Sequence, residues 1–191
     1  QNAIDAVSFR EQQEELREDE MQILIELGKE ENKNYFKIRD YGIGMKREII
    51  ERYFATLGKS YYKEYIGRKN LNYNSISNFG IGFLSVFKPC SKVIVHTKHF
   101  VENNYHLLTI NNDQGHYTIS SNLQDNFSTG TEIVCYLKED HIDNNKIIAY
   151  IESIMLDIKY NIVIKNENKD KRTIYAKKLR RGNNSNAIFI P

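Results

Sequence analysis

The sequence predicts an α+β fold of two layers, in which helices cover one mainly antiparallel, mixed sheet. Runs of alternating apolar and polar residues, typical of half-buried strands, recur along the chain. Asn, Asp and Gly residues separate most of these runs, which favours antiparallel pairing through short turns. Segments with apolar residues at helical spacing lie between the strand runs, and this mixture of strand pairs and helices is typical of an α+β sandwich.

The first third of the chain is expected to form a helix, a β-hairpin and a second helix. Apolar residues at helical spacing indicate the two helices, and alternation from Met21 to Leu27 indicates the first strand. In chain order the expected elements are a helix over residues 1–10, a charged connection over 11–20, a strand over 21–27, a turn over 28–34, a strand over 35–40 and a helix over 45–57.

The remainder is expected to contain a long loop, two more helices and the other strands. Residues 58–78 show little periodicity, and a connection of that length is typical of a functional loop. After it we expect a helix that opens at 79–85 and ends near Pro89, strands over 92–98, 105–110, 116–120 and 131–137, a helix over 144–160 and a last strand over 162–165.

The two ends of the sequence suggest a domain of a longer protein. The chain opens without Met, inside a helical pattern, and its last residues are polar and basic. We therefore expect one domain over residues 1–168, followed by a basic tail or the start of a further domain over 169–191.

Composition excludes several classes of protein. Hydrophobic residues make up 40% of the chain, too many for a largely disordered protein. The 27 basic and 25 acidic residues give a net charge of only +2, so the chain is no polycation built to bind nucleic acid. Cys90 and Cys135 match no zinc or redox spacing and are expected in the core of a cytoplasmic protein. No run approaches the roughly 18 apolar residues that a membrane span needs.

The segment from Asp40 to Met45, DYGIGM, is the first candidate site. A carboxylate at a strand end can accept a hydrogen bond from a ligand amine such as that of adenine. Gly42 and Gly44 let the backbone turn sharply and leave no Cβ between the main chain and a flat ligand. The alternative is a plain turn in which Asp40 caps the next helix.

The segment FGIGFLS, from Phe79 to Ser85, is the second candidate. Two glycines before a helix leave amide N–H groups free to face an anion, where the helix dipole also favours negative charge. Ser85 stands where a dinucleotide-binding fingerprint needs glycine. A P-loop ending at Gly58-Lys59-Ser60 is rejected because Tyr53 stands where that motif needs glycine.

Two weaker candidates lie near the ends of the domain. Asn2 and Asp5 share one face of the first helix, and Asn can give a neutral oxygen to Mg²⁺. Gly130-Thr131 opens a strand, where Thr is common in any case. Each would be an ordinary structural residue if it stood alone.

The order of these motifs resembles the GHKL ATPases, the superfamily of gyrase, heat-shock protein 90, histidine kinases and MutL. Within that superfamily, five segments are similar to the amino-terminal domain of the heat-shock protein 90 branch: IGM, LGKS, FGIGF, VIVHTKH and GTEIVCYLKED. The resemblance covers residues 1–165 and implies the Bergerat sandwich, which agrees with the predicted α+β fold.

The resemblance also implies a site for ATP or ADP with Mg²⁺. Asn2 would hold the metal, Asp40 would accept from the adenine amine, and Thr131 would join that contact through a water molecule. Gly44 and Met45 would line the base, Lys59 and Ser60 would lie at a lid near the phosphates, and glycines of the second motif would cradle them. The implied nucleotide-binding residues are Asn2, Asp5, Ala6, Asp40, Gly42, Gly44, Met45, Lys59, Ser60, Gly80, Gly82, Phe83 and Thr131.

The sequence departs from the family pattern in three places. The family's general base is a Glu four residues before the Asn, which would lie before Gln1, so no catalytic residue is assigned in this chain. Tyr53 stands where many members have Asn. The lid segment Tyr61–Tyr65 is unusually rich in tyrosine, which favours a divergent relative.

The function implied is that of an ATP-binding module of a chaperone-like ATPase, with lid closure, slow hydrolysis in the full-length protein and little turnover by this chain alone. A second copy brought together by ATP-driven closure and a client protein are the implied partners. The alternative is an ATP-dependent dimerisation switch of a DNA-handling or bacterial defence protein, which only the basic stretch 169–181 favours. A third reading is a scaffold that binds no nucleotide.

Overall fold

The structure is a computed structural model, and its strands form one sheet with helices on one side. It describes residues 2–51, 89–111, 116–122, 126–138, 143–155, 158–166 and 170–176. The strands are β1 (Gln22–Glu30), β2 (Lys33–Asp40), β3 (Cys90–Lys98), β4 (Tyr105–Asn111), β5 (His116–Asn122), β6 (Gly130–Leu137), β7 (Asn161–Lys165) and β8 (Lys171–Ile174). The helices are α1 (Asn2–Glu11), the short 3-10 helix Glu18–Glu20, α2 (Arg47–Ile50) and α5 (Asn144–Ile154).

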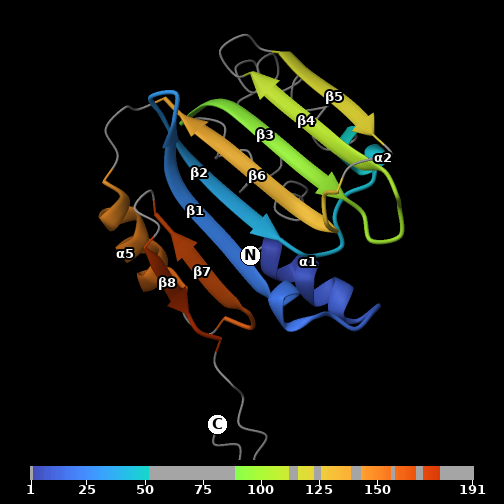
Figure 1. Cartoon of the computed structure of the whole chain (residues 1–191), viewed down its shortest axis with the longest axis horizontal. Helices are drawn as coiled ribbons and strands as arrows, with labels where there is room; N and C mark the ends of the chain where they lie inside the picture. Colours follow the sequence, from blue (N-terminus) through green and yellow to red (C-terminus); the bar gives the residue numbers. More distant parts are fainter. Residues whose placement is uncertain are drawn as a thin grey trace, which may run out of the picture.

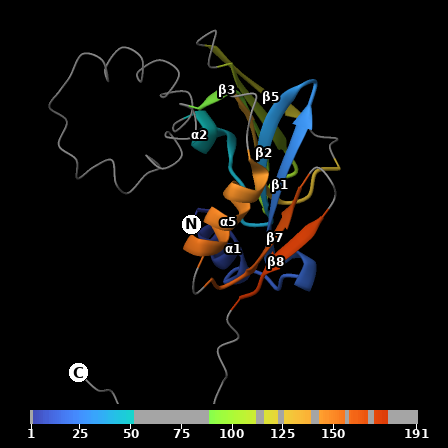
Figure 2. The same ribbon diagram turned by 90° about the vertical axis from the view of Figure 1, so that its left-hand side faces the viewer.

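The sheet has eight strands in the order β5-β4-β3-β6-β2-β1-β7-β8 (Figure 1). Neighbouring strands are antiparallel except for β1 and β7, which are parallel, so the sheet is mixed but mainly antiparallel. Figure 2 shows α1, α2 and α5 on the same side of the sheet. The predicted two-layer α+β sandwich is therefore confirmed.

The hairpin between β1 and β2 is tighter than predicted. The expected turn over residues 28–34 is wrong in its length, because both strands continue to the pair Glu30–Lys33. Only Glu31 and Asn32 lie between them, with φ of 47° and 65°. A two-residue turn with positive φ at both positions matches the right-handed twist of the strands. The exposed, charged tip of the hairpin hides the apolar alternation on which the prediction depended.

The helix predicted over 144–160 begins as expected but is shorter. The Asp143 carboxylate caps it by accepting hydrogen bonds from the N–H groups of Asn145 and Lys146. The helix ends at Ile154, and Ile158 and Tyr160 are buried in the connection that leads to β7. Apolar residues of this connection happen to continue the helical spacing, which explains the error.

Two hydrophobic clusters fill the space between the sheet and the helices. The larger one lies beneath α1 and α5 and includes Val7, Ile25, Leu27, Ile151 and Ile164. The smaller one lies beneath α2 and is formed by Ile50, Cys90, Val93, Val95, Leu108 and Cys135, with Met45 packed against it. The order of the strands therefore places the end of β2, where the candidate motif begins, between the two clusters.

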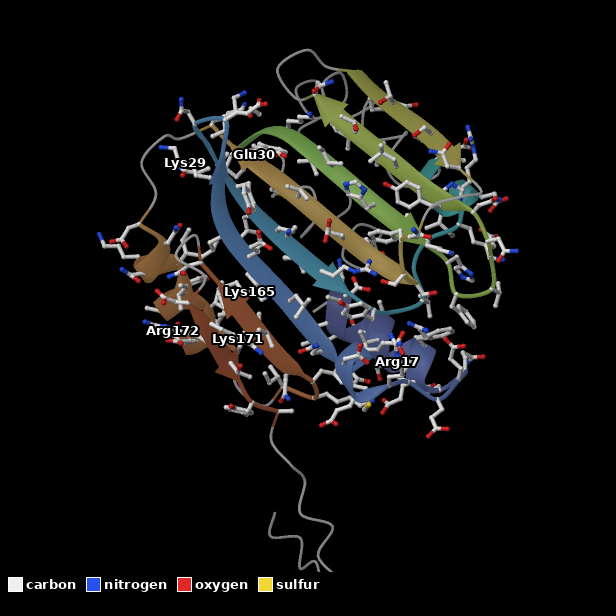
Figure 3. The ribbon with its side chains drawn as sticks, viewed as in Figure 1. Arg17, Lys29, Glu30, Lys165, Lys171 and Arg172 are labelled. Atoms are coloured by element: carbon white, nitrogen blue, oxygen red, sulfur yellow. The ribbon has the colours of Figure 1, made fainter. Side chains whose placement is uncertain are left out.

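Strand β8 extends the sheet beyond residue 168, where we expected the domain to end. Lys171 pairs with Lys165 of β7, both labelled in Figure 3, and Ile174 pairs with Ile162. The sheet therefore reaches Ile174. The domain boundary itself, and the nature of the residues after it, stay predictions.

Several predicted elements lie outside the described residues. These are the loop over 58–78, the helix expected at 79–85 and residues 52–57 of the helix over 45–57, whose described part contains α2. Within the described ranges, no helix has the length and apolar character needed to span a membrane.

Candidate functional site

Asp40 is the last residue of β2 and is only 6% exposed. It lies on the helix side of the sheet, because Phe36 and Ile38 alternate with polar residues of β2 and belong to the core. Its Oδ1 atom accepts a hydrogen bond of 2.9 Å from the N–H of Gly42. Burial raises the pKa of Asp40 to about 6, although the N–H groups of Gly42 and Thr131 and the charge of Arg39 oppose that rise.

Helix α1 closes on the segment that follows Asp40. The N–H of Ile43 donates to the carbonyl of Ala6 over 3.2 Å. A Cβ on Gly42 would lie 2.5 Å from the Cβ of Ala6, so only glycine allows this approach. At the other end of α1, buried Arg10 donates from Nη1 to the carbonyl of Tyr41 over 2.8 Å. Two contacts therefore fix the helix against the motif.

The turn after β3 supports the second glycine of the motif. Gly44 has φ of +66°, and a Cβ there would lie 2.0 Å from the carbonyl oxygen of Lys98. The N–H of Phe100 donates to the carbonyl of Ile43 over 3.0 Å. The structure thus requires glycine at position 44 both for its backbone conformation and for its neighbour.

A buried threonine of β3 joins the motif to β6. The N–H of Met45 donates to the Thr97 hydroxyl over 2.8 Å, and that hydroxyl lies 3.0 Å from the Thr131 hydroxyl. Thr97 also lies within hydrogen-bond distance, 3.2 Å, of the Gly130 carbonyl. Its side chain is fully buried. Thr97 therefore fixes Met45 and Thr131 relative to each other.

Arg39 lies on the face of the sheet opposite to the helices and binds the residues that directly precede β6. Its Nη2 atom donates to the carbonyls of Ser128 and Thr129 over 2.9 and 3.0 Å and to the Ser128 hydroxyl over 2.6 Å. Its guanidinium lies 4.7 Å from the ring centre of Tyr41 and 4.1 Å from that of Phe127. The side chain next to Asp40 therefore anchors the residues just before Gly130.

The structure brings together six of the residues implied by the resemblance. They are Ala6, Asp40, Gly42, Gly44, Met45 and Thr131, joined by the contacts above. Asn2 and Asp5 are exposed in the first turns of α1, before Ala6. The other candidates, Lys59, Ser60, Gly80, Gly82 and Phe83, lie outside the described residues.

Sequence reasoning missed Thr97 and Arg39. The alternation of β3 gave a usable sign for Thr97, because it is a polar residue at a position that continues the buried series of Val93 and Val95. Arg39 gave none, since its partners Ser128 and Phe127 are far away in the sequence.

The arrangement suits a flat ligand that carries an N–H donor. The buried Asp40 carboxylate offers an acceptor at the end of β2, and Thr131, with the Thr97 hydroxyl bonded to it, lies beside Asp40 at the start of β6. Gly42 and Gly44 keep side chains away from the backbone of the motif. A purine with an exocyclic amine is flat and carries such a donor. The acceptors of the site therefore fit the adenine of a nucleotide.

Comparison with protein families agrees with this chemistry. Residues 1–136 match the family described as "Histidine kinase-, DNA gyrase B-, and HSP90-like ATPase". The matched range contains the motif at 40–45, Thr97 and Thr131.

Individual relatives are bacterial chaperones. The chain is 33% identical over 188 residues to "Chaperone protein HtpG" of Wigglesworthia glossinidia brevipalpis, with 88% of this chain and 29% of that protein covered. It is 33% identical over 174 residues to HtpG of Buchnera aphidicola, covering 84% of this chain and 27% of that protein. It is 32% identical over 120 residues to HtpG of Helicobacter pylori, covering 61% of this chain and 19% of that protein. The chain thus spans less than a third of the length of these relatives.

Proposed function

The chain belongs to the family of histidine kinase-, DNA gyrase B- and HSP90-like ATPases and is an ATP-binding module of it; we propose that it serves an HSP90-like chaperone and binds the nucleotide at Asp40. The buried Asp40 carboxylate carries this proposal. Burying a carboxylate is costly, and its two oxygens can together accept more hydrogen bonds than the two from the N–H groups of Gly42 and Thr131, so a ligand amine can add a further one.

The base of the nucleotide is proposed to lie on the motif that follows β2. Asp40 accepts from the exocyclic amine, and Thr131 joins this contact through a water molecule. Gly44 and Met45 line the base. In support, Thr97 and the turn after β3 hold these residues in place in the structure.

The phosphates are proposed to lie between α1 and the second glycine motif. Asn2 is the residue we assign to Mg²⁺, because an amide oxygen suits a cation that keeps few protein ligands. Asp5 and Ala6 border this region from α1. When bound, the metal supplies positive charge to the phosphates. The backbone at Gly80, Gly82 and Phe83, with Lys59 and Ser60, is proposed to meet the remaining negative charge.

The activity of the whole protein is proposed from its relatives. They are chaperones named HtpG, which supports ATP-driven closure of two copies, a protein client and a cytoplasmic site of action. No residue of this chain is assigned as the base that activates water. We therefore expect the purified chain to bind nucleotide with little turnover.

Calorimetric titration with Mg-ADP and Mg-ATP tests the proposed site. We expect micromolar affinity for the wild-type chain and a loss of at least about 100-fold for Asp40→Asn, because a charged hydrogen-bond acceptor is removed. Asp19→Asn, an exposed acidic residue of the 3-10 helix, is the matched control. Equal affinities for the wild-type chain and Asp40→Asn, with both folded by circular dichroism, would overturn the proposal.

The alternative role in DNA handling is favoured by the basic stretch 169–181, whose residue Lys171 is described in β8. Lys165 and Lys171 form a cross-strand pair of like charges on the β7–β8 edge, and Figure 3 shows both. The HtpG relatives favour the chaperone role instead. Salt-dependent retention on DNA that is lost in the double variant K165Q/K171Q would revive the alternative.

A further inference from the structure

The two cysteines of the chain lie together in the core beneath α2. Cys90 begins β3 and Cys135 is near the end of β6, two strands that pair along their whole length (Figure 1). Both side chains are buried, both belong to the same hydrophobic cluster, and neither is in a disulfide. Sequence spacing alone gave no sign of this proximity.

A β-bulge brings the two sulfurs to the same side of the sheet. Lys92 pairs with Tyr136 and Val93 with Cys135, but Cys90 pairs with Leu137, so β3 carries one extra residue, Ser91. In a regular strand the alternation from Val93 would turn Ser91 toward the helices and Cys90 away. Because of the bulge, Cys90 shares the helix side with Leu137 and Cys135.

The two thiols are in direct contact. The Cys135 thiol donates a hydrogen bond to the Cys90 sulfur, and together with the positive charge of Lys138 this lowers the pKa of Cys90. The same hydrogen bond and burial raise the pKa of Cys135. Cys90 is thus the more nucleophilic member of the pair, and its hydrogen-bonded partner lies beside it on the neighbouring strand.

We propose that Cys90 and Cys135 are a site of reversible oxidation, at which a hydroperoxide converts the two thiols into an intramolecular disulfide between β3 and β6. The proposal rests on the bulge and the contact of the two sulfurs. It is independent of nucleotide binding, so either can fail without the other.

The reaction is balanced with one molecule of peroxide. The Cys90 thiolate attacks one peroxide oxygen, an S–O bond forms, the O–O bond breaks, and the released hydroxide takes a proton to become water. The Cys135 thiol then attacks the Cys90 sulfur, the S–S bond forms, the S–O bond breaks, and the departing hydroxide takes the Cys135 proton and leaves as the second water. Two thiols lose two electrons and two protons, and hydrogen peroxide is reduced to two molecules of water.

Access of the oxidant requires opening at the start of β3. Pro89, directly before Cys90, is exposed, and the extra residue Ser91 interrupts the regular ladder there. Opening of such an end costs less free energy than global unfolding. Oxidation is therefore expected to be slower than that of an exposed thiol but to occur in the native chain.

The test uses the wild-type chain, treated with hydrogen peroxide under native conditions, alkylated with iodoacetamide and digested without reduction. We expect mass spectrometry to find the peptides of Cys90 and Cys135 linked, with the loss of two hydrogen atoms. Dithiothreitol should restore both thiols. The oxidised chain should also melt at a higher temperature, because a cross-link restricts the unfolded chain.

Three outcomes would overturn the proposal. They are two intact thiols after a treatment that oxidises glutathione completely, sulfinic acid at Cys90 without a link, and a link that forms only when urea has unfolded the chain. Cys90→Ser and Cys135→Ser are controls and must give no intramolecular link. The wild-type result does not depend on whether these variants fold.

Discussion

The hydroxyl of Thr97 lies 3.0 Å from the hydroxyl of Thr131, and both side chains are buried. Thr97 also accepts from the N–H of Met45. One hydroxyl on β3 therefore connects the glycine motif after β2 with the first residues of β6. Because two strands and the motif share this contact, loss of the Thr97 hydroxyl should remove a hydrogen-bond partner from Met45 and from Thr131 at the same time.

Thr97→Val keeps the shape of the side chain and removes its hydroxyl. The Met45 N–H then loses its acceptor, and a buried donor without a partner costs about 1–3 kcal/mol. We expect a loss of that size in the free energy of unfolding, measured by urea denaturation, and weaker nucleotide binding by calorimetry. Thr118→Val, at an exposed position of β5, should change neither. Equal behaviour of the two variants would contradict a linking role for Thr97.

Asp40→Asn should stabilise the chain in the absence of nucleotide. The folded pKa of about 6 lies above the ordinary 3.8, so the folded chain binds the proton more tightly between these values. The contribution of Asp40 to the free energy of unfolding therefore falls as pH rises from 3.8 to 6 and stays low at neutral pH. Two pKa units correspond to about 3 kcal/mol, partly offset by the hydrogen bond from Thr131 that Asn accepts less well.

Urea denaturation at about pH 4 and pH 7 measures this effect. The stability of the wild-type chain should fall more between the two pH values than that of Asp40→Asn. Asp19→Asn is again the control. A variant that is less stable than the wild-type chain at pH 7 would show that Asp40 is held by contacts that outweigh its burial.

Nucleotide binding should weaken in acid. If the adenine amine donates to the ionised carboxylate, protonation of Asp40 with a pKa of about 6 competes with binding. The dissociation constant should rise about tenfold at one pH unit below that value and change little above it. Calorimetry across this range measures it. His99, which adjoins Gly44, also titrates, so the profile is to be repeated with His99→Gln, and a flat profile in that variant would assign the effect to His99 instead.

The strands that could be predicted are those whose alternation is complete within a few residues. The buried residues of β3 alternate cleanly from Val93 to Thr97, and β3 and β6 were both expected within two residues of their bounds. Strand β8 was missed because Lys171 and Arg172 are exposed at the edge of the sheet, so its only apolar sign is Ile174. An edge strand depends on its pairing with a neighbour, which a local pattern does not contain.

In the candidate site, too, features carried by one short segment could be predicted and contacts between distant segments could not. Asp40, Gly42 and Gly44 were predictable because one short segment carries the carboxylate and both glycines. The contact of Gly42 with Ala6 and that of Gly44 with Lys98 depend on how α1 and β3 pack, and only the resemblance to a family pointed to Ala6. The anchoring of Ser128 by Arg39 joins residues separated by 89 positions, which no spacing within the sequence predicts.

Arg39→Met should destabilise the segment Ser128-Thr129 that leads into β6. The variant keeps an apolar stem against Tyr41 and Phe127 but loses the donors to Ser128 and Thr129. Removing hydrogen bonds from a charged, buried donor costs about 1.5–3 kcal/mol, so we expect that loss in the free energy of unfolding. Arg39→Lys should not restore it, because lysine lacks the planar fork that stacks between rings.

The control for Arg39 is Arg172→Met on β8. That arginine is exposed and pairs with Glu152 over 3.5 Å, a surface contact worth less than about 1 kcal/mol. Nucleotide affinity should fall in Arg39→Met and stay unchanged in Arg172→Met. Full rescue by Arg39→Lys would mean that charge alone, rather than the geometry of the guanidinium, holds the loop.

Gly44→Ala should be the most damaging glycine substitution at the site. A left-handed backbone costs an ordinary residue about 1–2 kcal/mol, and the new methyl group would lie 2.0 Å from the Lys98 carbonyl, a backbone atom that cannot turn aside. Gly28→Ala is the matched comparison, because its methyl group would meet only the end of the Tyr35 side chain, at 2.5 Å, and its φ is not positive. Urea denaturation should give a loss above about 3 kcal/mol for Gly44→Ala and a clearly smaller one for Gly28→Ala. Similar losses would mean that the turn after β3 moves freely, in which case it does not position the motif that follows Asp40.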